Sequence, residues 1–362
     1  MKIGVPKEIK VHEYRVGLVP GSVGELVRSG HEILIETLAG AGIGCSDDEY
    51  RAAGAVILPT ARAVFEASEC IVKVKEPQLS ECALLRPGQI LFTYLHLAAD
   101  RPQAEALMTS GAHAIAYETV SARDGNLPLL TPMSEVAGRM SVQVGATLLQ
   151  KAAGGSGILI GGVPGTAPAR VLVIGGGVAG TAAAEIALGM RAAVTVIDKS
   201  LPRLRELDAR FGGQVRTLAS TADTIEREVA ASDLVIGSVL VPGAAAPKLV
   251  SEKMISGMRR GSVVVDIAID QGGCFATSRP TTHAEPTYVV HGVTHYCVTN
   301  MPGAVPRTST FALNAATLPY LRLLADRGLQ AALSSDPGFA AGLNVSAGKV
   351  TCPAVAAALG LY

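Results

Sequence analysis

The sequence lacks features that would each indicate a specialised class of protein. It has no excess of charge, with 31 basic and 31 acidic residues, so there is no electrostatic footprint for nucleic acid or an anionic membrane. The six cysteines lie at least 12 residues apart and form no Cys-x-x-Cys pair. This spacing argues against a disulfide framework and against a zinc site, and it favours a reducing, cytoplasmic setting.

Long uninterrupted apolar runs are also absent. The most apolar stretch, residues 158–190, is interrupted by Pro164, Pro168 and Arg170. It is therefore a poor membrane span and a good buried segment of an α/β domain. The first residues lead directly into folded sequence and show no signal-peptide pattern. We expect a protein that neither enters a membrane nor binds nucleic acid.

What is present is length and a regular alternation of elements. The chain has 362 residues, of which 49% are hydrophobic, which suffices for two domains with substantial cores. Short apolar runs alternate with helical stretches and predict an α/β fold. In the first part, strands are expected at Lys2–Val5, Glu32–Glu36, Cys70–Val74, Ile90–Leu95 and Ala114–Tyr117. A second series is expected at Val171–Ile174, Ala193–Ile197, Val215–Leu218, Leu234–Ile236, Val263–Ile267, Tyr288–Val290 and Tyr296–Val298.

The second series has the order of a doubly wound, Rossmann-type nucleotide-binding sheet. We predict that residues 131–304 form this domain, and that residues 1–130 and 305–362 together form a discontinuous α/β substrate domain. A long helix is expected from Ser134, whose hydroxyl would cap it, to about Ala152. Residues after Pro302 look helical, and a cleft between the domains is the expected place for chemistry.

A glycine-rich turn follows the strand at 171–174. Gly175, Gly177 and Gly180 form a Gly-x-Gly-x-x-Gly pattern before an alanine-rich helix. The first glycine permits a tight turn, the second a close approach of pyrophosphate, and the third close packing of helix on strand. Glycine turns also occur for packing alone, but here the strand and the helix lie on the correct sides. The pattern therefore predicts a dinucleotide site at the helix N-terminus.

Asp198 ends the next predicted strand, 23 residues after Gly175. Its carboxylate can accept hydrogen bonds from ribose hydroxyls and would repel a 2′-phosphate, which favours NAD over NADP. Lys199, Arg203 and Arg205 weaken that preference, unless they simply form a solvated basic face.

Four polar residues lie at strand ends or in loops. Arg15 follows the first strand, while Lys75, His96 and Asp270 follow the carboxyl ends of later strands, where α/β sheets bind ligands. Arginine and lysine can hold a carboxylate, and histidine can act as general acid or base. Each residue alone is more often structural, so only their joint placement favours a catalytic site.

The remaining histidines give no metal site. His291 and His295 have i, i+4 spacing, but the glycine and β-branched residues between them argue against the helix that would align them.

Taken together, these residues resemble the alanine dehydrogenase family, within the group that includes the nucleotide-binding subunit of transhydrogenase. The resemblance spans nearly the whole chain in one register. It rests on the segments 4–8, 13–16, 73–77, 93–97, 131–135, 173–180, 266–273 and 300–306.

The resemblance implies an NAD-dependent L-alanine dehydrogenase that interconverts L-alanine with pyruvate and ammonium, and it implies a homohexamer. It implies substrate binding by Arg15 and Lys75, and acid/base roles for His96 and Asp270. NAD contacts are implied at Ser134, Val178, Ala179, Asp198, Arg203, Ser220, Val239, Leu240, Ile267, Ala268, Ile269, Asp270, Arg279, Val298, Thr299, Asn300 and Met301.

Some positions depart from the family pattern. His12 stands where Asn is usual, Gly17 and Val19 replace Ala and Thr, and Arg191 replaces a common Gly. Arg203 replaces a usual Lys and retains the cation.

Three alternatives remain open from the sequence. One is a transhydrogenase subunit with a membrane partner, and another is an opine- or saccharopine-type dehydrogenase acting on larger amino acids. The third is a non-catalytic protein that senses NAD.

Overall fold

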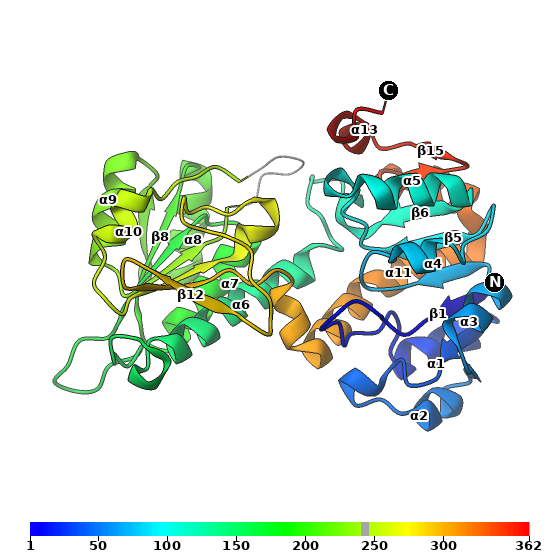
Figure 1. The fold of residues 1–362 in the computed structure, drawn as a ribbon, viewed down its shortest axis with the longest axis horizontal. Helices are drawn as coiled ribbons and strands as arrows, with labels where there is room; N and C mark the ends of the chain where they lie inside the picture. The colour runs from blue at the N-terminus through cyan, green and yellow to red at the C-terminus, as the bar shows by residue number, and fades with distance from the viewer. Residues whose placement is uncertain (240–245, 362) are drawn as a thin grey trace. The chain divides into compact units, whose positions relative to one another are not determined.

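The computed structural model describes residues 1–239 and 246–361, and the chain forms two compact units. Unit 1 comprises Met1–Met133 and Val305–Tyr362, and unit 2 comprises Ser134–Ala304. Each unit is built around one sheet with helices beside it (Figure 1).

Unit 1 has an eight-stranded sheet in the order β15-β14-β6-β5-β4-β1-β2-β3. Its strands are β1 (Lys2–Val5), β2 (Glu32–Glu36), β3 (Val56–Leu58), β4 (Cys70–Val72), β5 (Ile90–Thr93), β6 (His113–Ala116), β14 (Leu343–Ser346) and β15 (Lys349–Val350). Its helices are α1 (Pro20–Arg28), α2 (Asp47–Ala52), α3 (Ala61–Ala67), α4 (Leu79–Cys82), α5 (Arg101–Ser110), α11 (Pro306–Ser335), α12 (Pro337–Ala340) and α13 (Pro353–Leu359). Short 3₁₀ helices are η1 (Ala41–Ile43), η2 (Leu97–Ala99) and η3 (Tyr117–Thr119).

Unit 2 has a seven-stranded sheet in the order β12-β13-β11-β10-β7-β8-β9. Its strands are β7 (Arg170–Ile174), β8 (Ala193–Asp198), β9 (Arg216–Ala219), β10 (Leu234–Gly237), β11 (Val263–Asp266), β12 (Thr287–Val290) and β13 (Val293–Tyr296). Its helices are α6 (Thr131–Leu148, which begins in unit 1), α7 (Val178–Gly189), α8 (Leu201–Phe211), α9 (Ala222–Ala231) and α10 (Glu252–Ser256). The 3₁₀ helices are η4 (Lys151–Ala153), η5 (Ile267–Gln271) and η6 (Met301–Ala304).

Both sheets follow the doubly wound order. From β9 to β13, and from β3 to β6, the parallel strands lie in the order 3-2-1-4-5-6 of a Rossmann-type sheet. In unit 2 the chain winds outward from β7 in both directions, and connections of this kind between parallel strands place helices on opposite faces of a sheet. Ligands bind such sheets where the winding reverses, which is between β7 and β10 in unit 2 and between β1 and β4 in unit 1.

The strands are buried because their residues are apolar on both faces. Val171, Leu172 and Val173 of β7 are at most 1% exposed, as expected for a strand covered on both sides. The apolar runs therefore located most strands to within two residues, whereas the ends of the elements depend on tertiary contacts.

Several predicted bounds were wrong. The last strand of unit 2 is Val293–Tyr296 rather than 296–298, because it pairs with β12 and β11 over those residues. Helix α6 begins at Thr131, so Ser134 lies in its first turn and is not its N-cap. It ends at Leu148 rather than near residue 152. Beyond α11 and α12 the chain is not purely helical, because β14 and β15 extend the first sheet in antiparallel fashion.

Two departures from the family pattern occupy left-handed backbone. His12 has φ 59° and Arg191 has φ 64°. This conformation costs an ordinary residue roughly 1–2 kcal/mol, which glycine avoids and asparagine tolerates better. Val19 lies at the N-cap of α1 without a side-chain cap. A Cβ at Gly17 would lie 2.6 Å from the carbonyl oxygen of Val72, so the backbone there leaves no room for alanine.

Candidate functional site

The glycine turn of unit 2 joins β7 to α7. Gly175 has φ 101°, which favours glycine, and Gly177 is the N-cap of α7. A Cβ on Gly180 would lie 1.8 Å from the carbonyl oxygen of Gly175, so only glycine lets α7 pack this closely on the turn. A Cβ on Gly177 would meet nothing within 4 Å, and Val178 beside it is 39% exposed. The turn therefore presents backbone N–H groups to an open cradle that fits a dinucleotide pyrophosphate.

Asp198 lies beside this turn at the end of β8. Its carboxylate accepts hydrogen bonds from the backbone N–H of Gly176 at 2.7 Å and of Ser200 at 2.8 Å. The N–H of Ser220 donates to the Asp198 carbonyl at 3.0 Å. Arg203 donates from Nε to the Gly176 carbonyl at 2.7 Å and from Nη2 to Thr181 Oγ1 at 2.8 Å. The structure thus brings Asp198, Ser220 and Arg203 together around the glycine turn.

Further predicted contact residues follow the neighbouring strands. Val239 follows β10 and lies against the turn, because a Cβ on Gly175 would be 2.9 Å from Val239 Cγ2. Leu240 lies outside the described residues. Arg279 places its guanidinium 4.2 Å from the centre of the Tyr288 ring. Ser134 is half-buried in the first turn of α6.

Asp270 lies in η5 rather than directly after a strand, because β11 ends at Asp266. The carboxylate of Asp266 is fully buried and accepts hydrogen bonds from the N–H groups of Ala268 and Cys274 at 3.2 and 2.8 Å. It therefore fixes the backbone that carries Asp270, whose side chain is exposed.

The other predicted residues of these two segments differ in exposure. Ala268, Ile269, Val298 and Met301 are buried, whereas Ile267, Thr299 and Asn300 are half-buried. Asn300 has φ 62°, a left-handed conformation that asparagine tolerates.

In unit 1, Arg15 is buried and forms an ion pair with Glu13. It is 2% exposed, and it donates from Nε and Nη2 to the two carboxylate oxygens of Glu13 at 2.7 and 2.6 Å. Its Nη1 lies 3.2 Å from Met133 Sδ. Burial alone would lower the pKa of Arg15, but Glu13 outweighs it and raises the pKa above its ordinary value. The guanidinium is therefore a fixed, permanent cation.

Lys75 lies just beyond the carboxyl end of β4. The winding of the unit 1 sheet reverses between β4 and its neighbour β1. The residue is 9% exposed, and its Nζ is 3.6 Å from Glu76 Oε2. Burial alone would raise the pKa of Glu76, but Lys75 and Lys10 hold that pKa below its usual value. Lys75 thus lies beside an ionised carboxylate.

His96 follows β5 and is exposed. It has a left-handed backbone with φ 52° and ψ 34°. Its N–H donates to Glu118 Oε1 at 2.6 Å, and its ring stacks on that of Tyr94 with centroids 5.7 Å apart and planes 6° apart. Burial raises the pKa of the Tyr94 hydroxyl well above its usual range, so Tyr94 is neutral and stacks an uncharged ring on His96.

Sequence reasoning missed the acidic residues that hold these side chains. Glu13 binds Arg15, Glu8 binds the backbone around Lys75, and Glu118 binds the backbone at His96. Their only signal in the sequence was proximity to a strand end, and for Glu118 even that needed knowledge that β5 and β6 are neighbours.

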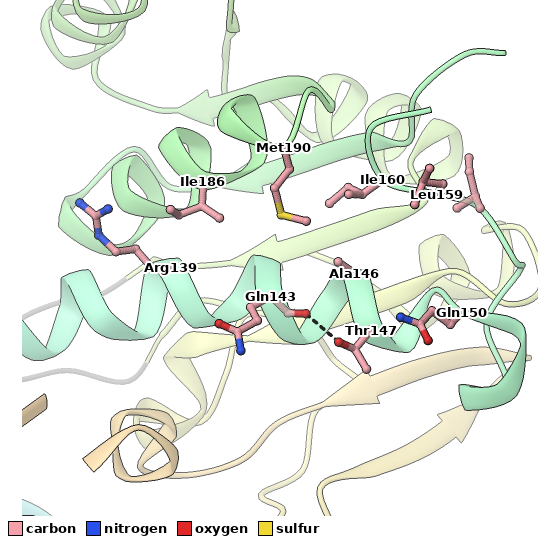
Figure 2. Close-up of a pocket in the computed structure, with 10 residues that line it drawn as sticks. Arg139, Gln143, Ala146, Thr147, Gln150, Leu159, Ile160, Ile186 and Met190 are labelled. Atoms are coloured by element: carbon pink, nitrogen blue, oxygen red, sulfur yellow. Dashed lines mark hydrogen bonds between the residues drawn. The ribbon is translucent and has the colours of Figure 1, made fainter. Parts of the chain in front are cut away.

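An apolar groove lies elsewhere in unit 2, between α6, α7 and the segment around Ile160 (Figure 2). Ile186, Met190 and Leu159 line it, together with Gln143 and Thr147 of α6. It contains none of the predicted site residues, so we do not assign it to the site.

Two features that the described part of the chain lacks bear on other kinds of function. Among the helices within 1–239 and 246–361, none is both long and apolar enough to cross a membrane. In the same part of the chain, no cluster of three or more His, Cys, Asp or Glu side chains has the arrangement needed to hold a metal ion.

Two α/β units with Rossmann strand order, one of which carries a Gly-x-Gly-x-x-Gly turn, define a two-domain α/β class of protein. The chain belongs to the alanine dehydrogenase/PNT family. The model of the family's N-terminal domain matches residues 4–137, and that of its C-terminal domain matches residues 141–353. The family and the α/β fold class predicted from the sequence are confirmed.

Full-length relatives agree with this assignment. The chain is 61% identical to "Alanine dehydrogenase" of Halomonas elongata and 53% identical to that of Mycobacterium tuberculosis, in both cases over all of this chain and 97% of the relative. A solved structure of "L-alanine dehydrogenase" is 53% identical, with a TM-score of 0.96 over 99% of both chains. A transhydrogenase from Sinorhizobium meliloti is 24% identical, with a TM-score of 0.85 over 97% of this chain and 100% of that one, which shows the fold alone.

Proposed function

We propose that the protein catalyses the reversible oxidative deamination of L-alanine. L-Alanine, NAD⁺ and water give pyruvate, ammonium, NADH and a proton. The observation that carries this proposal is the joint placement of a buried guanidinium, a nearly buried ammonium and an exposed imidazole after strands β1, β4 and β5 of one sheet. The names of relatives that are 53–61% identical over the full length support alanine as the substrate.

We propose that unit 2 holds NAD, because the open cradle at Gly177 and the carboxylate beside it suit that molecule. The N–H groups at the start of α7 bind the pyrophosphate, and Asp198 accepts hydrogen bonds from the adenosine ribose. Further contacts to NAD are proposed at Ser134, Ala179, Arg203, Ser220, Val239, Leu240, Arg279, and residues 267–270 and 298–301. When bound, NAD accepts a hydride from the Cα of the substrate.

We propose that the residues of unit 1 bind the substrate and move its protons. Arg15 and Lys75 bind the alanine carboxylate, since a fixed guanidinium and an ammonium are complementary to a carboxylate. His96 takes and returns protons as water adds to the oxidised substrate and ammonium leaves. Asp270, from unit 2, orients the nitrogen or the water. A homohexamer and a cytoplasmic location, which the resemblance implies, remain proposals.

The test is NAD reduction by the purified protein on addition of L-alanine, followed by NADH absorbance. Glycine, L-serine, D-alanine and NADP are the parallel conditions. We expect turnover with L-alanine and NAD, reversed by pyruvate and ammonium. Binding of NAD without turnover on any amino acid would reject the proposal in favour of a nucleotide sensor or a transhydrogenase subunit.

Substitution by alanine is expected to have different effects at two glycines of the turn. In Gly177→Ala the new methyl enters open space, so Tm stays near wild type while the Kd for NAD rises by about tenfold or more, as the methyl occupies the place of the pyrophosphate. In Gly180→Ala the methyl collides with the Gly175 carbonyl at 1.8 Å, and Tm falls. Thermal unfolding and NADH fluorescence titration measure both effects. Wild-type NAD affinity in folded Gly177→Ala would contradict the cradle.

Asp198→Ala is expected to weaken NAD binding and to narrow the advantage of NAD over NADP. A charge-assisted hydrogen bond contributes about 1.5–3 kcal/mol, which corresponds to roughly 10- to 150-fold in Kd. Asp208→Ala is the matched control, because it removes an exposed aspartate from α8 in the same unit. Titration with NAD and with NADP measures the ratio of their Kd values. An unchanged ratio in Asp198→Ala would remove Asp198 from the ribose site.

A further inference from the structure

The backbone that carries Lys75 has a strand neighbour on one side only. On the β5 side, the N–H of Lys73 donates to the Phe92 carbonyl at 3.2 Å, and Thr93 Oγ1 donates to the Lys75 carbonyl at 2.9 Å. On the other side, β1 pairs with β4 through Gly4 and Ile71 and then ends at Val5. Beyond that point β1 has ended and cannot accept the backbone N–H groups of Val74 and Lys75.

The carboxylate of Glu8 occupies this place. Its Oε1 accepts hydrogen bonds from the N–H of Val74 at 2.7 Å and of Lys75 at 3.3 Å. Its Oε2 accepts one from Lys73 Nζ at 2.9 Å. A buried N–H without an acceptor costs about 1–3 kcal/mol, so this side chain does what a neighbouring strand does elsewhere in the sheet.

Glu8 belongs to a buried cluster of ion pairs with Lys73 and Glu81. Lys73 Nζ also donates to Glu81 Oε1 at 2.7 Å, and Glu81 Oε2 accepts the N–H of Gln78 at 2.8 Å. Glu8, Lys73 and Glu81 are all at most 7% exposed. Burial raises the pKa of Glu8, and the charge of Lys73 acts against that rise. Tyr117 completes the arrangement by donating from its hydroxyl to the Lys73 carbonyl at 3.1 Å.

We propose that Glu8 is the positioning residue that aims Lys75 at the substrate carboxylate, with Lys73 and Glu81 as its support. This inference rests on the proposed function. Glu8 touches the backbone at Lys75, whereas Glu81 touches only Lys73 and the α4 entry at Gln78. The two glutamates therefore share the same buried cation, but only one of them contacts the segment that carries Lys75.

That difference provides a matched experiment with the full-length protein. Glu8→Gln and Glu81→Gln each remove one carboxylate from Lys73, so both are expected to lower Tm. Only Glu8→Gln is expected to raise KM for pyruvate, by about 10- to 100-fold, because small misplacements of a binding group have effects of this size. The kcat changes less than KM, since the lost interaction is one of binding. The Kd for NADH stays at its wild-type value.

Four outcomes separate the possibilities. A raised pyruvate KM in Glu8→Gln with a near-wild-type KM in Glu81→Gln supports the proposal. Equal KM values in the two variants overturn it, because the cluster would then be structural only. If Glu8→Gln does not fold, Glu8→Asp replaces it: the retained charge supports folding, the shorter side chain withdraws from the Lys75 backbone, and a wild-type KM overturns the proposal. Absence of alanine turnover in the wild type would instead reject the proposed function.

Discussion

Replacement of His96 by alanine is expected to lower kcat by about 10²- to 10⁴-fold, the range that general acid–base catalysis contributes. The imidazole of His96 lies exposed after β5, where Glu118 accepts the backbone N–H of His96 and Tyr94 stacks on its ring. An imidazole in this position can act as general acid or base. Because the proposed NAD site is built from unit 2, the Kd for NAD stays unchanged. Steady-state kinetics with alanine and NADH titration measure the two quantities.

The matched control for this prediction is His291→Ala. His291 is also an exposed histidine with φ 52°, but it lies between β12 and β13 of unit 2, outside the proposed site. Both variants thus lose an exposed histidine from left-handed backbone, and His291→Ala also removes the contact between His291 Nε2 and Glu252 Oε1 at 2.9 Å. An unchanged kcat in His96→Ala, or an equal loss in His291→Ala, would remove His96 from the mechanism.

Arg15→Ala is expected to impair both folding stability and substrate use. It removes the guanidinium that forms an ion pair with the fully buried carboxylate of Glu13. Removing one partner of a buried pair costs about 3–5 kcal/mol in the free energy of unfolding. It also removes the guanidinium cation that is proposed to attract the substrate carboxylate, so KM for pyruvate and alanine rises. Denaturant unfolding and steady-state kinetics measure the two losses.

A double variant separates the two losses. Arg15→Met with Glu13→Gln removes both charges of this buried pair, so most of the lost stability is expected to return. The substrate KM remains high, because no guanidinium is present. Recovery of the wild-type KM in the double variant would show that Arg15 stabilises the fold but does not bind substrate.

The dinucleotide turn was predicted from the sequence because its determinants are local. Gly175, Gly177 and Gly180 act within one strand–turn–helix, and their conformations and clearances suit the roles expected of them. Most strands were likewise located by their apolar runs. The strand at 293–296 and the start of α6 were misplaced because pairing partners and first-turn geometry, rather than local composition, set those ends.

The surroundings of the residues that are proposed to bind substrate could not be predicted in the same way. Arg15 was expected to present its fork to a ligand, and the structure shows that fork already paired with Glu13. The antiparallel extension by β14 and β15 was also missed, because the partner of β14 is β6, more than 200 residues earlier in the chain.

By itself, the sequence determined the family, the α/β class, the nucleotide turn with Asp198, and the identity of Arg15, Lys75 and His96 as the residues to examine. Only the tertiary structure decided how those side chains are held. Glu8 reaches Val74 across 66 residues and Glu118 reaches Leu95 across 23, since the carboxyl ends of β1, β4, β5 and β6 meet at one edge of a parallel sheet. Strand order brings such carboxylates to the amides and cations they bind, and strand order is a property of the whole fold rather than of any local pattern.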